Sequence, residues 1–263
     1  MVINFKKHYA TEKRDLAYCI LTYNEQKKLA KKLVSRINQL ISLDSNSKIL
    51  EIGAAQGRFM IALTKLGYFC EGLEPYKDAI VISKEFSKKL KTEINITRSV
   101  AENIPYDNNS FDVVFALSVI EHVKNVEDVF TEIFRILKPK GVFFFSTASS
   151  LCPYQGEIRF FPFFSWYPEK IKLQIMVWAV ENKPSLVGYT DTPAINWFTP
   201  WKANRLLMNA GFEKIYDRWD IIRKDELSIP KKNILKIIKK RRITKLLADI
   251  IVPGCAYLAV KGE

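Results

Sequence analysis

Residues 49–57 constrain the fold of this chain more than any other segment. They read ILEIGAAQG, a short apolar run interrupted by Glu51 that leads into a turn containing Gly53 and Gly57. Residues 58–66, which follow, are patterned as a helix. Glycine lets the backbone approach a ligand without an intervening Cβ, and the amino end of a helix suits polar ligand groups. The strand, the glycine turn and the helix together predict a ligand-binding α/β unit.

Strands and helices alternate on both sides of this unit. We expect strands at 48–52, 69–73, 94–97, 112–117 and 142–146, and helices at 24–42, 58–66, 76–90 and 126–137. Strands that alternate with helices form a parallel sheet with helices on both faces. The first 147 residues therefore predict an α/β fold.

The pattern changes after Thr147. Residues 148–198 contain an aromatic cluster between 160 and 167 and a helix expected at 169–180, and they do not read as another simple crossover. We interpret them as an insertion. A helix at 199–210, a strand at 213–222, a basic helix at 231–245 and a last strand at 255–260 complete the chain.

Composition excludes several classes of protein. The 263 residues, 48% of them hydrophobic, can build a core without a disulfide or metal, and they exclude a disordered chain. The four cysteines form no CxxC pair, so we expect no zinc site and a reducing, cytoplasmic location. No segment has the pattern of a signal peptide or of a membrane span. The net charge of +13 favours an anionic partner.

The glycine spacing bears on the ligand. Dinucleotide-binding turns usually read GxGxxG, whereas Gly53 and Gly57 are spaced GxxxG and Glu51 lies inside the strand. This pattern disfavours a nicotinamide cofactor. Glu74, at the end of the second strand, is placed to accept hydrogen bonds from ribose hydroxyls, with a solvated loop acid as the alternative interpretation.

Several motifs in this order resemble those of class I S-adenosylmethionine-dependent methyltransferases. The first is matched by Glu51, Gly53 and Gly57, and the second by Glu74. The later ones are similar to AENIP at 101–105, SFDVV at 110–114, VIEHV at 119–123 and LKPKG at 137–141. The resemblance covers residues 45–147.

The resemblance implies a fold and a domain organisation. The fold would be α/β, a Rossmann-like seven-stranded sheet that is mostly parallel with a C-terminal antiparallel strand, plus cap insertions. The whole chain, 1–263, would be a single methyltransferase domain. Its parts would be an N-terminal helical region at 1–44, a cofactor-binding core at 45–147, a cap insertion at 148–198, and a C-terminal helix and strand hairpin at 199–263 with a basic insertion at 222–252.

The resemblance also implies the cofactor, S-adenosyl-L-methionine, and the residues that bind it. These are Glu51, Gly53, Ala55, Gly57, Glu74, Ala101, Glu102 and Leu117. Ala55 stands where the family usually has the middle glycine, and Val100 where it often has an acid that caps the adenine amino group. Adenine would then be recognised by backbone groups near Ala101 and Glu102 and by apolar contact.

Glu121 and His122 are the candidate catalytic residues, because they follow the fourth strand, which ends beside the ligand crevice. A neutral imidazole can take a proton from a hydroxyl as its oxygen attacks a methyl sulfonium. The alternative is a histidine hydrogen-bonded for structure. The pair resembles that of ubiquinone-biosynthesis O-methyltransferases, in which a further acid helps to hold a divalent metal. That position is Ser118 here, so we predict no metal.

The insertions at 148–198 and 222–252 would wall the acceptor side of the cofactor. Polar and aromatic side chains in the first that could orient an acceptor are Tyr154, Glu157, Arg159, Tyr189, Asp191 and Trp197. We expect O-methylation of a small-molecule, sugar or lipid-linked acceptor.

The basic helix at 231–245 carries eight basic and no acidic residues, with four aliphatic side chains on one side, namely Ile234, Leu235, Ile237 and Ile238. It could lie on an anionic membrane, contact nucleic acid phosphates, or be a solvated helix whose apolar side packs on the domain.

Other functions stay open at this point. The net charge of +13 is compatible with an RNA methyltransferase. Ala55, Val100 and the basic helix are compatible with a non-catalytic membrane-surface adaptor that keeps the fold. A nicotinamide-dependent dehydrogenase is a more distant alternative, because the fold alone does not fix the reaction.

Overall fold

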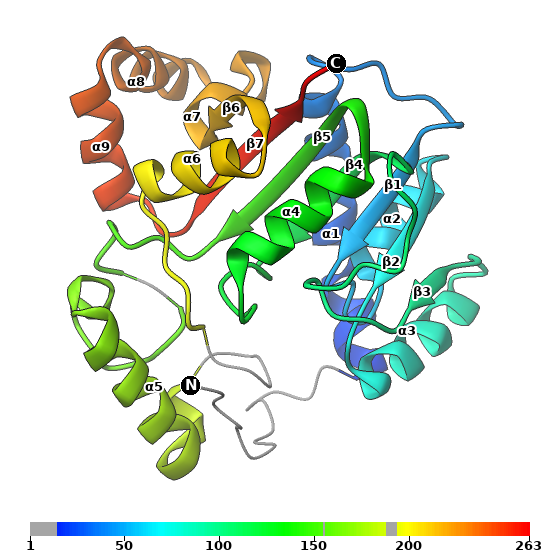
Figure 1. The fold of residues 1–263 in the computed structure, drawn as a ribbon, viewed down its shortest axis with the longest axis horizontal. Helices are drawn as coiled ribbons and strands as arrows, with labels where there is room; N and C mark the ends of the chain where they lie inside the picture. The colour runs from blue at the N-terminus through cyan, green and yellow to red at the C-terminus, as the bar shows by residue number, and fades with distance from the viewer. Residues whose placement is uncertain (1–14, 155, 188–193) are drawn as a thin grey trace.

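The computed structural model describes residues 15–154, 156–187 and 194–263 (Figure 1). Within these residues the sheet has seven strands in the order β3-β2-β1-β4-β5-β7-β6. They are β1 (Lys48–Ile52), β2 (Phe69–Leu73), β3 (Asn95–Thr97), β4 (Phe111–Leu117), β5 (Leu137–Thr147), β6 (Phe212–Asp217) and β7 (Cys255–Lys261). The first five are parallel, and β7 lies antiparallel between β5 and β6. The predicted α/β fold is confirmed.

Helices cover both faces of the sheet. They are α1 (Leu16–Ile37), α2 (Arg58–Lys65) and α3 (Lys77–Lys89) on one face, and α4 (Val126–Ile136) and α6 (Pro200–Asn209) on the other. In β4, Val113 and Phe115 pack into the first layer, whereas Val114 and Ala116 pack into the second. Alternate residues of a strand point to opposite faces, so an uninterrupted apolar strand supplies both cores.

The strand expected at 213–222 is too long, and this prediction is wrong at its end. β6 stops at Asp217, whose side chain accepts hydrogen bonds from the amides of Trp219 and Asp220. The Asp220 side chain accepts in return from the Asp217 amide, so the two acids form a capping box. This box starts the short helix α7 (Arg218–Ile221) and takes the backbone out of the sheet.

Two expected helices differ from the structure in their bounds. The helix expected at 24–42 begins earlier, because the Asp15 side chain accepts from the Tyr18 amide and caps α1, and it ends at Ile37. The basic helix expected at 231–245 is two helices, α8 (Ile229–Lys240) and α9 (Arg242–Ile251). Arg241, at φ −142° and ψ 151°, is extended and separates them.

Residues between β5 and α6 form a cap with an apolar cluster of its own. It contains η1 (Phe164–Trp166), α5 (Glu169–Asn182) and η2 (Pro184–Leu186), and a further short turn, η3 (Lys224–Glu226), precedes α8. Phe164, Met176 and Trp197 are buried in the cap cluster. In Figure 1 the cap lies beyond the end of the sheet to which β5 points. Those are the carboxyl ends of the parallel strands, where α/β sheets bind ligands.

The turn after β1 holds three residues with left-handed backbone, each separated from the next by one residue. Gly53 and Gly57 have φ values of 68° and 71°, and Ala55 has a φ of 47°. A Cβ in this left-handed region costs about 1–2 kcal/mol. Ala55 therefore occupies a glycine-type conformation without being glycine.

Replacing Ala55 tests this strain. Ala55→Gly relieves the Cβ but adds about 0.5–1 kcal/mol of backbone entropy loss, so we expect a net stabilisation of about 0.5–1 kcal/mol in urea unfolding. Gly53→Ala is the opposed control, because its Cβ would collide with Val119 at a φ of 68°. We expect it to destabilise by about 2 kcal/mol or more. A destabilising Ala55→Gly would contradict the strain argument.

Candidate functional site

The candidate site lies where the strand order reverses, at the carboxyl ends of β1 and β4. From β1 the chain passes to β2 and β3 on one side of the sheet, whereas β4 and β5 lie on the other side. Crossovers leaving in opposite directions open a crevice at this point. Val119, just after β4, packs over Gly53, so the two turns that border the crevice touch.

Glu74 closes the turn after β1 from the neighbouring strand. Its Oε2 accepts a hydrogen bond from the Ala55 amide at 2.8 Å, and its Oε1 accepts from the Tyr76 amide at 3.0 Å. The side chain is 4% exposed. Glu74 is therefore a buried, anchored carboxyl group at the edge of the crevice, and the alternative of a solvated loop acid is wrong.

Glu51 is a second buried carboxyl group beside this turn. Burial raises its pKa to about 8, and the nearby Glu74 adds to the rise. A hydrogen bond from the Met60 backbone and the charge of Arg58 act in the opposite direction. Among the described residues, Glu51 Oε2 and the buried Gln56 Oε1 have no hydrogen-bond partner. Buried polar oxygens of this kind are normally satisfied, so both are available to a ligand.

The remaining predicted cofactor residues border the same edge of the sheet. Leu117 is the last residue of β4, and Ala101 and Glu102 form a turn beyond β3. The Glu102 carboxylate accepts from the Lys124 amide at 2.7 Å, which ties this turn to the segment before α4. Val100 is 47% exposed, so an apolar surface is present where the family often has an acid.

Glu121 and His122 are neighbours in sequence but lie in different environments. Glu121 is 2% exposed, and its Oε2 accepts from Thr147 Oγ1 at 2.7 Å. Its carbonyl oxygen accepts from the amides of Ile195 and Asn196. Burial raises the pKa of Glu121 to about 8, with a further contribution from Glu157. His122 is half-buried in the turn after β4.

Asn196 and Thr147 are residues of this region that the sequence analysis missed. Asn196 Nδ2 donates to the carbonyls of Ile120 and Val123 at 3.3 and 2.7 Å. Residues 194–198, which lead from the cap to α6, are called the cap return. Asn196 and the Thr147 hydroxyl join the cap return and the end of β5 to the turn that carries Glu121 and His122. No local sequence pattern predicts these hydrogen bonds of Asn196 and Thr147, because the residues that they join are far apart in sequence.

The polar cap residues named from the sequence are not equivalent in the structure. Glu157 is half-buried and close enough to Glu121 to raise its pKa, and burial also raises its own pKa. Tyr154 is 75% exposed. Trp197 is buried within the cap, where the Lys172 ammonium lies 4.3 Å from its ring centroid, so it packs the cap rather than facing an acceptor. Tyr189 and Asp191 lie outside the described residues.

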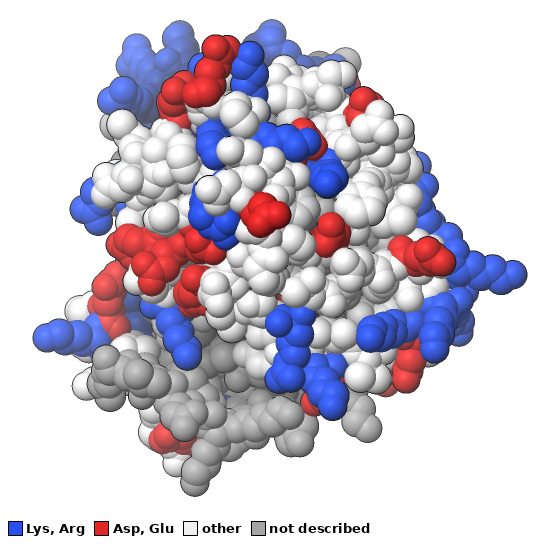
Figure 2. Space-filling view, turned by 45° about the vertical axis from the view of Figure 1, so that its right-hand side comes forward, with Lys and Arg blue, Asp and Glu red and all other residues white. Residues whose placement is uncertain are grey.

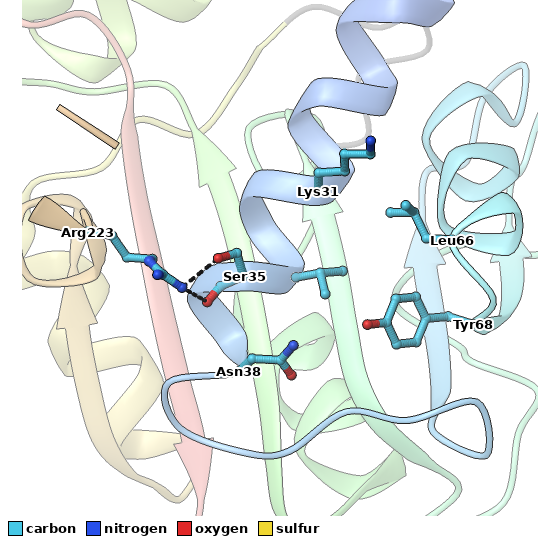
Figure 3. Close-up of a pocket in the computed structure, with 7 residues that line it drawn as sticks. Lys31, Ser35, Asn38, Leu66, Tyr68 and Arg223 are labelled. Carbon is cyan, nitrogen blue, oxygen red and sulfur yellow. Dashed lines mark hydrogen bonds between the residues drawn. The ribbon is translucent and has the colours of Figure 1, made fainter. Parts of the chain in front are cut away.

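A cavity of about 280 Å³ lies elsewhere, between α1, the end of α2 and Arg223 (Figure 3). Tyr68, which lines it, precedes the first residue of β2, so the cavity is at the amino ends of the parallel strands. Arg223 closes one side by donating to Ser35 Oγ at 2.6 Å and to the Ser35 carbonyl at 3.1 Å. The opposite end of the sheet carries the glycine turn, so this cavity is not part of the candidate site.

Comparisons with known proteins agree with the fold. Residues 50–145 match a family described as a methyltransferase domain. This segment runs from β1 to β5 and contains the glycine turn, Glu74 and the Glu121–His122 pair. Residues 50–145 are thus similar to methyltransferase domains, in agreement with the motifs.

Individual relatives are similar over part of their length. The chain is 28% identical over 119 residues to the ubiquinone biosynthesis O-methyltransferase of Rickettsia bellii, which is 45% of this chain and 48% of that protein. The chain thus spans about half the length of the curated relatives it matches.

Two solved structures share the fold. A Haemonchus contortus phosphoethanolamine N-methyltransferase 2, in complex with phosphomonomethylethanolamine and S-adenosylhomocysteine, is 17% identical with a TM-score of 0.57 and covers 89% of this chain and 52% of its own. The Bacillus subtilis YcgJ protein is 14% identical with a TM-score of 0.54 and covers 91% and 99%.

The buried Glu121 predicts a pH-dependent stability. A carboxyl group with a pKa near 4.5 in the unfolded chain and about 8 in the fold releases its proton on unfolding between these values, so the free energy of unfolding falls as pH rises through this window. Glu121→Gln removes this loss. We expect it to stabilise the protein by about 2–4 kcal/mol at pH 9 and by little at pH 4.5 in urea unfolding.

The matched control for that comparison is Glu127→Gln, an exposed acid in the first turn of α4. Its effect on the free energy of unfolding should be small and similar at pH 4.5 and pH 9, because the Glu127 side chain is exposed to solvent in the fold. Equal effects of the two substitutions at both pH values would contradict a buried, protonated Glu121.

Proposed function

We propose that this protein transfers the methyl group of S-adenosylmethionine to a hydroxyl oxygen of a small-molecule acceptor. The observation that carries this proposal is the arrangement of two buried carboxyl groups, Glu51 and Glu74, around a turn with left-handed backbone at Gly53, Ala55 and Gly57. The methyltransferase domain match over these residues supports it.

The residues around the turn fit the cofactor. Glu51 Oε2 is a buried acceptor without a partner among the described residues, which suits the ammonium group of the methionine part. Glu74 uses its oxygens for the Ala55 and Tyr76 amides, and a carboxylate has further lone pairs for ribose hydroxyls. A side chain on Gly53 would collide with Val119, so this position must stay small for the two turns to meet. Ala101 and Glu102 would border the adenine, and Leu117 would contact it through apolar atoms.

Charge favours the methylated cofactor over its demethylated product at this site. The methyl donor carries a sulfonium and an ammonium group, whereas the product has lost the sulfonium charge. Glu51, held protonated by burial, would ionise beside these cations, because an opposite charge stabilises the carboxylate. Binding of S-adenosylmethionine would then release up to one proton per molecule bound. Binding of the demethylated product would release a smaller fraction of a proton.

S-adenosylmethionine supplies an electrophilic methyl group on a neutral leaving thioether. The protein then has to align the acceptor and, for a hydroxyl, to remove a proton. We assign the second role to His122, which follows β4 at the crevice edge. Glu121, which bonds to Thr147 and carries the cap return on its carbonyl, would position His122 rather than touch the acceptor.

The surface charge favours a small acceptor over a nucleic acid. On the face shown in Figure 2, both acidic and basic side chains lie around a largely uncharged middle, so no unbroken basic surface crosses this face. A nucleic acid would need a row of phosphate-binding side chains along its path. We therefore keep RNA methylation as the second candidate.

Calorimetry with S-adenosylmethionine tests the cofactor site first. We expect micromolar binding, with proton release between pH 6.5 and 7.5 revealed by buffers of different ionisation enthalpy. Glu74→Gln should weaken binding about tenfold or more, because ribose hydroxyls lose a charged acceptor. Glu51→Gln should remove most of the proton release.

Glu71→Gln is the control, a strand β2 acid that hydrogen-bonds to Tyr106 Oη at 2.7 Å and does not border the turn. It should bind the cofactor as the wild type does. The absence of binding by a folded wild-type protein would leave Ala55 and Val100 as signs of a degenerate site and would support the adaptor hypothesis.

The role of His122 is tested by methyl transfer itself. A screen of phenols, catechols and sugars with radiolabelled S-adenosylmethionine supplies the acceptor, and His122→Ala should then lower kcat about 10²–10⁴-fold while leaving the Kd for the cofactor unchanged. The wild-type rate should rise with pH as an imidazole deprotonates, and the variant should lose this dependence. Full turnover by His122→Ala would exclude the base assignment.

A further inference from the structure

Helix α9 packs on the protein by its polar side. Lys245 Nζ lies 2.8 Å from Asp217 Oδ2 and 2.7 Å from Asp220 Oδ1, and Trp219 Nε1 donates to Asp249 Oδ1 at 2.8 Å. Lys245 and Asp249 are one turn apart on α9, so this face of the helix points inward. No residue of α9 is buried. An amphipathic helix that anchors by charged groups leaves its apolar face outside.

The outward face of α9 is a continuous aliphatic stripe. Ile243, Leu247 and Ile251 are 63%, 55% and 74% exposed, and they recur at helical spacing. Leu246, between them, is also exposed. Surface aliphatic residues occur singly on most proteins, but an ordered row of them marks an interaction surface.

Helix α8 extends this surface. Of the four aliphatic residues that the sequence analysis placed on one side of the helix, only Leu235 is buried, while Ile234 and Ile237 are 56% and 62% exposed. The apolar side of α8 therefore packs on the domain at Leu235, whereas Ile234 and Ile237 face outward. In Figure 1, α8 and α9 form the upper left corner of the molecule, outside the β6 edge of the sheet.

Basic residues surround the aliphatic side chains. Residues 229–248 contain eight lysines and arginines and no acid. Those that are exposed are Lys231, Lys236, Lys239, Lys240, Arg241 and Arg242. We name the exposed aliphatic and basic side chains of α8 and α9 together the basic–aliphatic face.

Charge complementarity identifies the occupant of the basic–aliphatic face. A second copy of this chain would bring like charges together across a two-fold interface, where they repel. A single-stranded nucleic acid would find no aromatic side chain for stacking, because residues 229–252 contain none. A surface of phosphate groups above a hydrocarbon layer satisfies both the basic and the aliphatic side chains.

We propose that α8 and α9 dock this protein onto an anionic lipid bilayer. The exposed isoleucines and leucines enter the boundary between headgroups and acyl chains, and the surrounding lysines and arginines contact lipid phosphates. No covalent step is involved, and the proposal does not depend on the methyl acceptor. The inward ion pairs of Lys245 hold α9 in this orientation before it meets the membrane.

Vesicle flotation with the full chain tests the proposal. We expect the protein to float with vesicles of phosphatidylcholine containing about one third phosphatidylglycerol at low salt, to bind pure phosphatidylcholine far more weakly, and to be released at high salt. Leu247→Ser with Ile251→Ser should lower the bound fraction about tenfold or more. Lys236→Glu with Lys240→Glu should do the same for anionic vesicles.

Matched controls change the same properties elsewhere. Met208→Ser removes a 66% exposed apolar side chain from α6. Lys84→Glu with Lys88→Glu makes the same charge change on exposed positions of α3. Both controls should bind vesicles as the wild type does, and all variants should keep the wild-type unfolding midpoint within a few degrees, because the substituted side chains are exposed.

Four outcomes would overturn the proposal. They are no flotation of the wild type with anionic vesicles, equal binding to neutral vesicles, unchanged binding by the α8 and α9 variants, and equal losses in the controls. Loss of transfer RNA binding by Lys236→Glu with Lys240→Glu, without vesicle binding by the wild type, would assign the face to nucleic acid. A dimer that Leu247→Ser with Ile251→Ser dissociates in sedimentation, without vesicle binding, would assign it to a second copy.

Discussion

The hydrogen bonds that join the end of β1 to the end of β2 are the constraint on which the candidate site depends. The Leu73 carbonyl accepts from the amides of Gly53 and Ala54, and the Glu74 carboxylate accepts from the Ala55 amide. These bonds hold the turn in a left-handed path that exposes backbone to the crevice. Val119 then packs on Gly53 and brings the turn after β4 alongside. The turn after β1, proposed to bind the cofactor, and the turn after β4, which carries His122, are thus held together by these hydrogen bonds and by the packing of Val119 on Gly53.

Buried acids show the cost of building such a site. Burial raises the pKa of both Glu51 and Glu121 to about 8. Each group therefore lowers the free energy of unfolding as the pH rises above the ordinary pKa of a glutamate. Glu51 makes sense as an acceptor whose charge returns when a cationic ligand arrives, and Glu121 as the bridge that joins β4, Thr147 and the cap return. Stability is given up where the site needs polar groups inside.

The basic–aliphatic face and the candidate site differ in which side chains they bury. At the candidate site, Glu51 and Glu74 are buried, whereas on α9 the polar side chains Lys245 and Asp249 bond inward and the aliphatic side chains face out. A sequence pattern reports that a helix has two faces, but it does not report which face meets the protein. For α9, the inward face is set by the ion pairs of Lys245 with Asp217 and Asp220. These two acids form the capping box of α7, which the sequence analysis did not predict because it expected a strand at 213–222.

The order and type of the elements from β1 to β5 could be predicted from the sequence, because each signal there is local: an apolar run, a glycine turn, a helix with its cap. The positions of Glu51, Gly53, Gly57 and Glu74 followed from the same local pattern and from the rule that parallel strands end at one edge. The sequence by itself determined this framework. Only the tertiary structure decided the burial of Trp197, the partners Thr147 and Asn196, and the outward face of α9, because each depends on contacts between residues far apart in the chain.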